Sequence, residues 1–98
     1  MKITKKQEGA SMVVALSGRL DTETASKLDE ALKDSLGGLD TLTFDFKDLD
    51  YVSSAGLREL LKAKRNMKYG GTVKVINANE IVREVFSVTG FDTVVELA

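Results

Sequence analysis

The sequence predicts an α/β fold in which about five strands form one mostly parallel or mixed sheet that begins with an N-terminal hairpin. Three observations support this: two strand-like segments with a short connection at the start, later apolar segments of period 2, and helical stretches between the strands. The order is β-β-α-β-α-β-α-β, which is typical of parallel strands with right-handed crossovers. With 98 residues, 43% of them hydrophobic, the chain suits one domain over residues 1–98.

The first two strands are expected to form the hairpin. Residues 2–8 are polar and predict an edge strand, whereas residues 11–17 are apolar and β-branched enough for a more buried strand. The short connection at Gly9-Ala10 suits a tight turn. The segment Gly18-Arg19-Leu20-Asp21 is expected to break the second strand.

The first helix is expected to follow directly. Asp21 or Thr22 can cap its N-terminus, because both side chains carry an oxygen that accepts a backbone N–H. Gly37-Gly38 is expected to end the helix. Its buried stripe recurs at helical spacing and consists of Ala25, Leu28, Leu32 and Leu36.

The middle of the chain predicts a strand, a turn and a second helix. Residues 42–46 alternate between apolar and polar side chains, and residues 48–53 are expected to form the turn that follows. Gly70-Gly71 is expected to end the helix, whose apolar stripe contains Leu57, Leu60, Leu61 and Met67. Its outer face is basic and is either simply solvated or a docking site for an acidic partner; it carries Lys62, Lys64, Arg65 and Lys68.

The last part of the chain predicts a strand, a helix and a short final strand. Residues 72–76 form the strand, and Asn77 stands three residues before Glu80 at the spacing of a capping box. Gly90 is expected to stop the helix, and residues 93–97 are expected to add the final strand. The buried face of this third helix is expected to consist of Ile81, Val82, Val85 and Phe86.

The composition excludes several classes of function. The chain has no cysteine and no histidine, which removes thiol nucleophiles, the commonest general base and the commonest transition-metal ligands. We therefore expect no catalytic residue, no metal site and no cofactor. A formal charge of −1 argues against direct nucleic-acid binding. No apolar run approaches the roughly 20 residues of a membrane span, and the start lacks a signal-peptide pattern, so we expect a cytoplasmic protein without membrane insertion.

The segment around Ser53 and Ser54 is the main candidate for a functional site. It lies where a strand passes into a helix, and the N–H groups and dipole of a helix N-terminus favour an anion. A phosphoryl group on one of these serines would be tolerated by the fold and would change the surface strongly. The other reading is an ordinary helix cap, although two hydroxyls followed by Gly56 exceed what a cap requires.

Three carboxylates are candidates for the surroundings of these serines. The connections after parallel strands lie along one edge of the sheet, which would bring Asp21 near Ser54. Asp21 is also a plausible cap on its own account, and Asp48 and Asp50 are otherwise ordinary turn residues. As a group, the three could position Mg²⁺ that a partner's nucleotide carries in, but they do not indicate a metal site of the chain itself.

Taken in order, these segments resemble the STAS domain of bacterial anti-sigma factor antagonists. The resemblance covers essentially the whole chain. It rests on Leu16–Asp21 after the second strand, on the segment from Phe44 to Leu57, and on the strand Val73–Ile76 that leads into the third helix. The central strand-turn-helix motif is the most specific of the three segments.

The resemblance implies a small switch that regulates transcription. In this family the unmodified domain binds an anti-sigma factor that is a serine kinase, phosphorylation ends the binding, and a PP2C-type phosphatase restores it. When the sequences are aligned on Gly56, the phosphorylated serine falls on Ser54, while the family's aspartate is replaced by Ser53, which is the alternative acceptor. The partner-binding residues implied are Asp21, Thr22, Asp50, Ser53, Ser54, Ala55, Gly56, Leu57 and Arg58.

Two other functions remain open. STAS-like domains also serve as regulatory or structural subunits of membrane transporter complexes, where phosphorylation can be irrelevant. A small enzyme is the third reading, and the absence of a recognisable nucleophile and base argues against it.

The polar outer faces of the helices favour a monomer when the protein is free.

Overall fold

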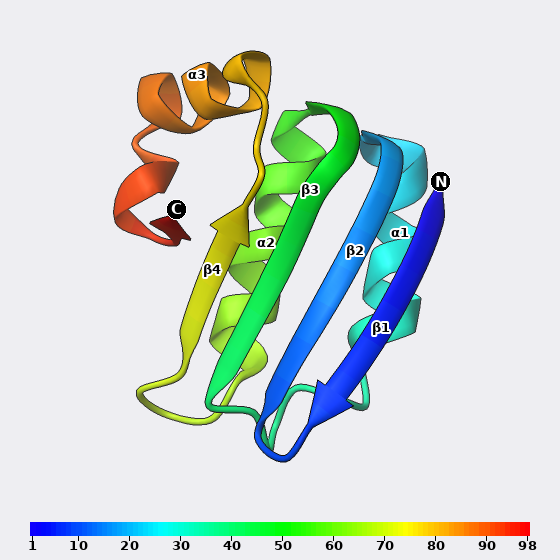
Figure 1. Ribbon diagram of the computed structural model, residues 1–98, viewed down its shortest axis with the longest axis vertical. Coiled ribbons are helices and arrows are strands. Elements are labelled where there is room, and N and C mark those ends of the chain that lie inside the picture. The colour runs from blue at the N-terminus through cyan, green and yellow to red at the C-terminus, as the bar shows by residue number, and fades with distance from the viewer.

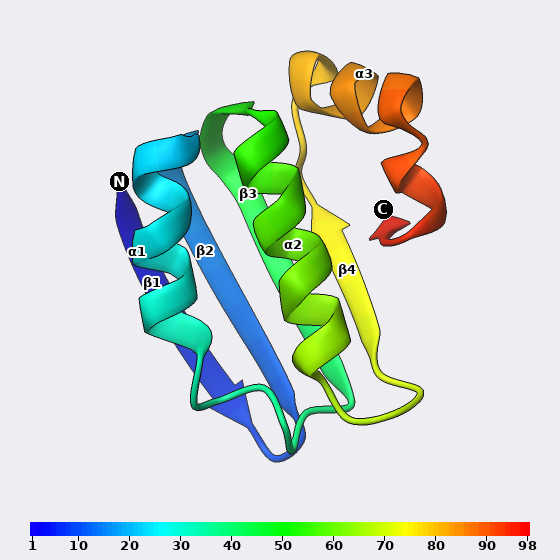
Figure 2. The same ribbon diagram turned by 180° about the vertical axis from the view of Figure 1, so that it is seen from behind.

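The computed structural model describes all residues from 1 to 98 and contains a single five-stranded sheet with its helices to one side (Figures 1 and 2). The element order matches the predicted order, with one additional 3₁₀ turn near the C-terminus. The elements are β1 (Lys2–Glu8), β2 (Ser11–Leu20), α1 (Thr22–Leu32), β3 (Thr41–Val52), α2 (Ser54–Asn66), β4 (Thr72–Ile76), α3 (Glu80–Thr89), the 3₁₀ turn η1 (Phe91–Thr93) and β5 (Glu96–Leu97).

The strands lie in the sheet in the order in which they occur along the chain, β1-β2-β3-β4-β5. β1 pairs with β2 antiparallel, through a turn in which Gly9 has a φ of 59°. The other three pairs are parallel. The predicted mixed sheet with an N-terminal hairpin is therefore confirmed.

The core lies between the sheet and the helices. Figure 2 shows α1 and α2 side by side across one face of the sheet, and Figure 1 shows the opposite face with no helix over it. The strands show this asymmetry, because alternate residues of β2 and β3 are buried while those between them are partly or fully exposed. The largest fully buried side chains include Phe44, Phe46, Phe86, Leu16, Leu28, Leu42 and Leu60.

The predicted break at residues 18–21 and the predicted turn at residues 48–53 are wrong. β2 continues to Leu20 and β3 continues to Val52, so both segments are paired strands. The pairing contains two register shifts, one between Ala15 and Ser17 and one between Gly18 and Arg19. Each shift inserts an extra residue into β3, which interrupts the alternation of side chains and makes a bulged strand look like a turn.

Both predicted helix ends were placed too late. α1 ends at Leu32 and α2 ends at Asn66, before the glycine pairs, although Leu36 and Met67 remain buried as expected. After α1 the chain closes tight turns, in which the N–H of Ser35 donates to the carbonyl of Leu32 at 2.9 Å. Burial of an apolar side chain therefore did not require a helical backbone at either position.

The N-terminus of α3 also differs from the prediction. Its cap is Asn79, whose Oδ1 accepts the N–H of Val82 at 2.8 Å, and not Asn77. Asn77 instead has a left-handed backbone, with a φ of 60°, and its Nδ2 donates to Asp45 at 3.0 Å. Asparagine tolerates this conformation better than most residues, which explains why the chain turns here before the helix starts.

The C-terminal third of the chain has a smaller buried face and a shorter strand than predicted. Val82 and Phe86 are buried, but Ile81 is 59% exposed, so the expected four-residue face of α3 is wrong for that residue. Gly90 ends the helix in a left-handed conformation, as predicted. The following residues then form η1, which leaves only Glu96–Leu97 to pair with β4.

Candidate functional site

The two serines lie where β3 passes into α2, next to the end of β2. The N–H of Ser53 donates to the carbonyl of Leu20 at 2.8 Å, which joins the two strand ends. Ser53 is the N-cap of α2, and its hydroxyl accepts the N–H of Gly56 at 3.3 Å. Ser54 is the first residue of the helix and is exposed. The first serine therefore has a structural task, whereas the second presents its side chain to solvent.

Gly56 allows α2 to approach the end of β2 closely. A β-carbon at this position would lie 2.8 Å from both the carbonyl oxygen and Cγ of Leu20, and 3.1 Å from Cγ1 of Val52. The same carbonyl accepts the N–H of Ser53, and this hydrogen bond holds it in place. A glycine in the first turn therefore sets the position of the helix N-terminus relative to β2.

Asp21 lies at the same edge, directly after Leu20, and caps α1. Its carboxylate accepts the N–H groups of Glu23 and Thr24, each at 3.1 Å, and the Thr24 hydroxyl accepts the N–H of Asp21 in return. The bond from the Thr24 N–H is the main cause that lowers the pKa of Asp21 below 3.8. Its contribution to stability is thus present above that pH and is lost as the pH falls through the lowered pKa. The group is an anion at neutral pH.

The other sequence-predicted partner-binding residues are divided between surface and interior. Thr22, Asp50 and Arg58 are exposed, and Asp50 lies at the second bulge of β3. Ala55 is half-buried. Leu57 is only 6% exposed and packs in the core, so its side chain supports the surface from below. The structure thus brings Asp21, Ser53 and Ser54 to one edge through the Leu20–Ser53 bond and leaves Leu57 beneath it.

Arg19, Tyr51 and Asn79 lie at this edge but were missed in the sequence. Arg19 and Tyr51 are register partners on β2 and β3, and the guanidinium of Arg19 lies 4.7 Å from the centre of the Tyr51 ring. The same guanidinium is 4.0 Å from the Asp21 carboxylate. Arg19 lies in the predicted break and Tyr51 in the predicted turn, and the strand pairing that joins them depends on the bulges. No local sequence signal indicates that contact.

Asn79 connects α3 to the same region. Besides capping the helix, its Nδ2 donates to the carbonyls of Leu49 at 3.2 Å and Asp50 at 3.4 Å. These carbonyls belong to the bulged end of β3, so one side chain fixes both the start of α3 and the backbone next to Asp50. Asparagine is a preferred cap, so Asn79 carries a local signal, but the capping-box spacing to Glu80 favours Asn77 instead.

Two substitutions of Asn79 are expected to distinguish its role as the cap of α3 from its hydrogen bonds to the β3 carbonyls. Asn79→Ala should lower the free energy of unfolding by about 1 to 2 kcal/mol, because both the cap and the bonds to β3 are lost. Asn79→Asp keeps the capping oxygen but loses the amide donor, so its loss of stability should be smaller while the amide signals of residues 49 and 50 shift. Urea unfolding and amide NMR spectra measure the two effects. Equal loss of stability in both variants would contradict the division of tasks.

A cluster of charged side chains joins α1 to α2 and consists of Asp29, Glu59 and Lys62. Nζ of Lys62 lies 2.9 Å from the Asp29 carboxylate, and this hydrogen bond is the main cause that lowers the pKa of Asp29. Glu59 lies beside the pair. Burial is the main cause that raises the pKa of Glu59, and the charge of Asp29 adds to it. Two neighbouring carboxylates thus have pKa values displaced in opposite directions.

Glu59→Gln is expected to stabilise the protein increasingly as the pH rises. For a carboxyl with a raised pKa in the folded state, stability is present below the unfolded value of 4.5 and is lost as the pH rises through the folded value. Glutamine removes this loss and keeps a donor for Asp29. Unfolding curves from about pH 4 to about pH 7 should therefore diverge from those of the wild type. Glu84→Gln, on the exposed face of α3, serves as the control and should show no such divergence.

The fold agrees with comparisons to known proteins. A family model described as "Mlab, STAS domain" matches residues 3–96. The chain is also 32% identical to the proposed anti-sigma factor antagonist BtrV of Bordetella bronchiseptica, over 100% of this chain and 86% of that protein. The chain belongs to the STAS domain family of anti-sigma factor antagonists. These antagonists are regulators and not enzymes, which confirms the prediction that this STAS protein is not an enzyme.

Solved structures of STAS proteins share the fold. An anti-sigma factor antagonist from Mycobacterium paratuberculosis is 23% identical and has a TM-score of 0.83, over 98% of this chain and 83% of that one. Unphosphorylated SpoIIAA is 21% identical with a TM-score of 0.85, covering 99% and 88%. Phosphorylated SpoIIAA from Bacillus is 20% identical with a TM-score of 0.76, covering 99% and 91%.

No helix of this chain combines the length and apolar character that crossing a membrane requires.

Proposed function

We propose that the protein is a phosphorylation-controlled antagonist that binds an anti-sigma factor serine kinase when Ser54 is unmodified. The observation that carries the proposal is the exposed Ser54 at the first position of α2, at the edge that Asp21 shares. Residues 1–98 would act as one STAS domain in the cytoplasm, monomeric when free. Transfer of a phosphoryl group to Ser54 would end binding, and a PP2C-type phosphatase would restore it.

Ser54 is a better acceptor than Ser53 on geometric grounds. The Ser53 hydroxyl accepts the N–H of Gly56, and the residue is half-buried. A phosphoryl group there would require the N-cap to be rebuilt. Ser54 can be modified without breaking that bond, because it lies outside the cap and faces solvent. We therefore assign the switch to Ser54 and the cap to Ser53.

The free domain is well placed to bear the added charge. A phosphoserine carries about −1.5 to −2 charges at pH 7, and the N-terminus of a helix stabilises an anion. In a complex the same charge would lie against a partner and near the Asp21 anion, where solvent no longer screens it. Two forms of SpoIIAA, unphosphorylated and phosphorylated, have the same fold. We therefore expect a switch by electrostatics and sterics, with little movement of the backbone.

The motif Ser53-Ser54-Ala55-Gly56 differs from the usual family motif in lacking an acidic residue at position 53. The sites that could direct a kinase to Ser54 are then the remaining carboxylates of the edge, Asp21 and Asp50. Asp50 is exposed, so both a kinase and an anti-sigma factor could reach it. We propose that these two anions take over part of the recognition for which the family uses the missing aspartate.

A capture experiment with three baits tests this function. The wild-type protein, Ser54→Asp and Ser11→Asp are each incubated with lysate of the source organism, and retained proteins are identified by mass spectrometry. Ser11 is exposed at the opposite end of β2, so its variant controls for added charge alone. A kinase-like anti-sigma factor on the wild type and on Ser11→Asp, but not on Ser54→Asp, is the expected result.

Two outcomes would overturn the proposal. Equal retention of an anti-sigma factor on all three baits would show that Ser54 is a helix residue without a switching role. Equal retention of transporter subunits on all three would favour the transporter function. The wild-type complex is then incubated with ATP and the phosphorylated residue is mapped. This shows whether Ser54 or Ser53 accepts the phosphoryl group.

A further inference from the structure

Arg58 lies one turn after Ser54 on the outer face of α2, and both side chains are exposed. Residues four apart on a helix are neighbours, with β-carbons about 5–6 Å apart. Helical side chains also lean toward the N-terminus, so a residue covers the turn that precedes it. The guanidinium of Arg58 can therefore reach the surroundings of the Ser54 hydroxyl. The opposite face of the helix is buried and contains Gly56, Leu57, Leu60 and Ala63.

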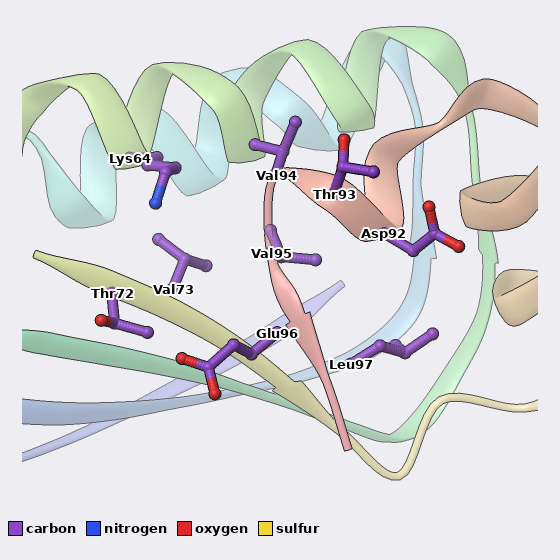
Figure 3. A pocket seen from close by; sticks show the side chains of 9 residues that line it. All are labelled: Lys64, Thr72, Val73, Asp92, Thr93, Val94, Val95, Glu96 and Leu97. Atoms are coloured by element: carbon purple, nitrogen blue, oxygen red, sulfur yellow. The ribbon is translucent and has the colours of Figure 1, made fainter.

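Three other cations of α2 and of the turn after it are directed elsewhere. Lys62 and Lys68 form ion pairs with carboxylates of α1 and of the loop before β3, at 2.9 and 2.7 Å. Lys64 lines a pocket between α2, β4 and the C-terminal segment, and Figure 3 shows its side chain directed toward β4. Arg58 takes part in none of the ion pairs of the structure. It is thus an unpaired cation one turn from the candidate phosphorylation site.

Arg19 is a second cation at this edge, but it already has partners. Its guanidinium lies 4.7 Å from the centre of the Tyr51 ring and 4.0 Å from the Asp21 carboxylate. Because that carboxylate is itself an anion next to the serines, Arg19 is partly neutralised where it stands. A new negative charge at residue 54 would therefore find its free counter-charge in Arg58.

We propose that Arg58 is the intramolecular counter-ion of phosphorylated Ser54. This inference rests on the proposed function, because it requires a phosphoryl group at that position. The planar guanidinium forms two parallel hydrogen bonds to phosphate oxygens, an arrangement that a single serine hydroxyl does not offer. Phosphorylation would then change the surface twice, since it adds negative charge at Ser54 and withdraws the positive charge of Arg58. An acidic side chain of the anti-sigma factor that pairs with Arg58 in the unmodified complex would lose that contact.

The full chain with phosphoserine incorporated at position 54 during translation tests this pair without a kinase or a partner. A ³¹P NMR titration measures the pH at which the phosphate loses its second proton. A nearby cation favours the doubly charged phosphate, so this midpoint should lie lower in the wild-type sequence than in Arg58→Gln. The expected difference is about 0.2 to 0.4 pH units, which corresponds to an ion pair four residues apart on a helix. The Nε–H signal of Arg58 should also move on phosphorylation.

Arg65→Gln is the matched control. It removes the same charge from the same exposed face of α2, about 16 Å from residue 54 along the helix axis at 1.5 Å per residue. This separation exceeds the screening length of about 8 Å at physiological salt, so the midpoint should equal that of the wild type. Arg58→Lys keeps the charge without the planar fork and should lie between the wild type and Arg58→Gln. Asp21 and Asp50 are present in every variant, so their repulsion of the phosphate cancels in the comparison.

Two results would overturn the proposal: equal midpoints in the wild type and Arg58→Gln, or an Arg58 Nε–H signal that does not change on phosphorylation. The amide spectrum of each variant shows directly whether it is folded. Neither measurement involves an anti-sigma factor. A failure here therefore leaves the capture experiment and the proposed function intact, and a failure of the capture experiment does not alter the titration.

Discussion

Ser54→Asp is expected to weaken the complex with the anti-sigma factor by roughly 30- to 4,000-fold, which corresponds to about 2–5 kcal/mol for an uncompensated charge at an interface. The free domain should lose no stability, because a carboxylate in the first turn interacts favourably with the helix dipole. Binding of the purified partner, measured by calorimetry, and thermal unfolding of the free protein give the two values. A loss of affinity of less than about threefold would show that Ser54 does not lie in the interface.

Asp21 allows the cause of this loss to be tested. The double variant Ser54→Asp with Asp21→Asn keeps an oxygen that can cap α1 but removes one of the two negative charges. If repulsion between the two carboxylates contributes to the loss, Ser54→Asp should weaken binding less in the Asp21→Asn protein than in the wild type. Additive effects of the two substitutions would assign the loss to the partner's own surface. Ser54→Ala, which adds no charge, should bind nearly as the wild type does.

Gly56→Ala is expected to destabilise the protein by about 1–3 kcal/mol, the usual cost of inserting a methyl group where there is no room. The added carbon would lie 2.8 Å from the carbonyl oxygen of Leu20, which is fixed by its bond to Ser53. Relief of this contact requires α2 to move away from β2, and that movement carries Ser54 with it. The variant should therefore bind the anti-sigma factor more weakly even where it remains folded.

Gly38→Ala is the matched control for Gly56→Ala. A β-carbon at Gly38 would meet nothing within 4 Å, and its φ lies outside the left-handed region. The same substitution should there be neutral or stabilising by up to about 1 kcal/mol, through the entropy of the unfolded chain. Urea unfolding of both variants measures the difference. A Gly56→Ala protein as stable as Gly38→Ala would show that the close approach of α2 to β2 is not needed.

The candidate site could be read from the sequence only where its signals are local. Ser53-Ser54 at a helix start and Asp21 as a cap depend on neighbours within a few residues, and their places in the fold were predicted correctly. Arg19, Tyr51 and Asn79 were missed, because their contacts join segments far apart in the chain. The segments 18–21 and 48–53 were misread for the same reason: a bulge is recognisable only against the strand it pairs with.

The order of strands and helices, the mixed sheet and most of the buried core follow from the sequence alone, because the periods of apolar residues differ between the two kinds of element. The tertiary structure decided where β2, β3, α1 and α2 end. It fixed which serine is held as a cap and which is exposed, through the bond from Ser53 to Leu20 and the space left by Gly56. These are long-range packing results, and no local pattern encodes them.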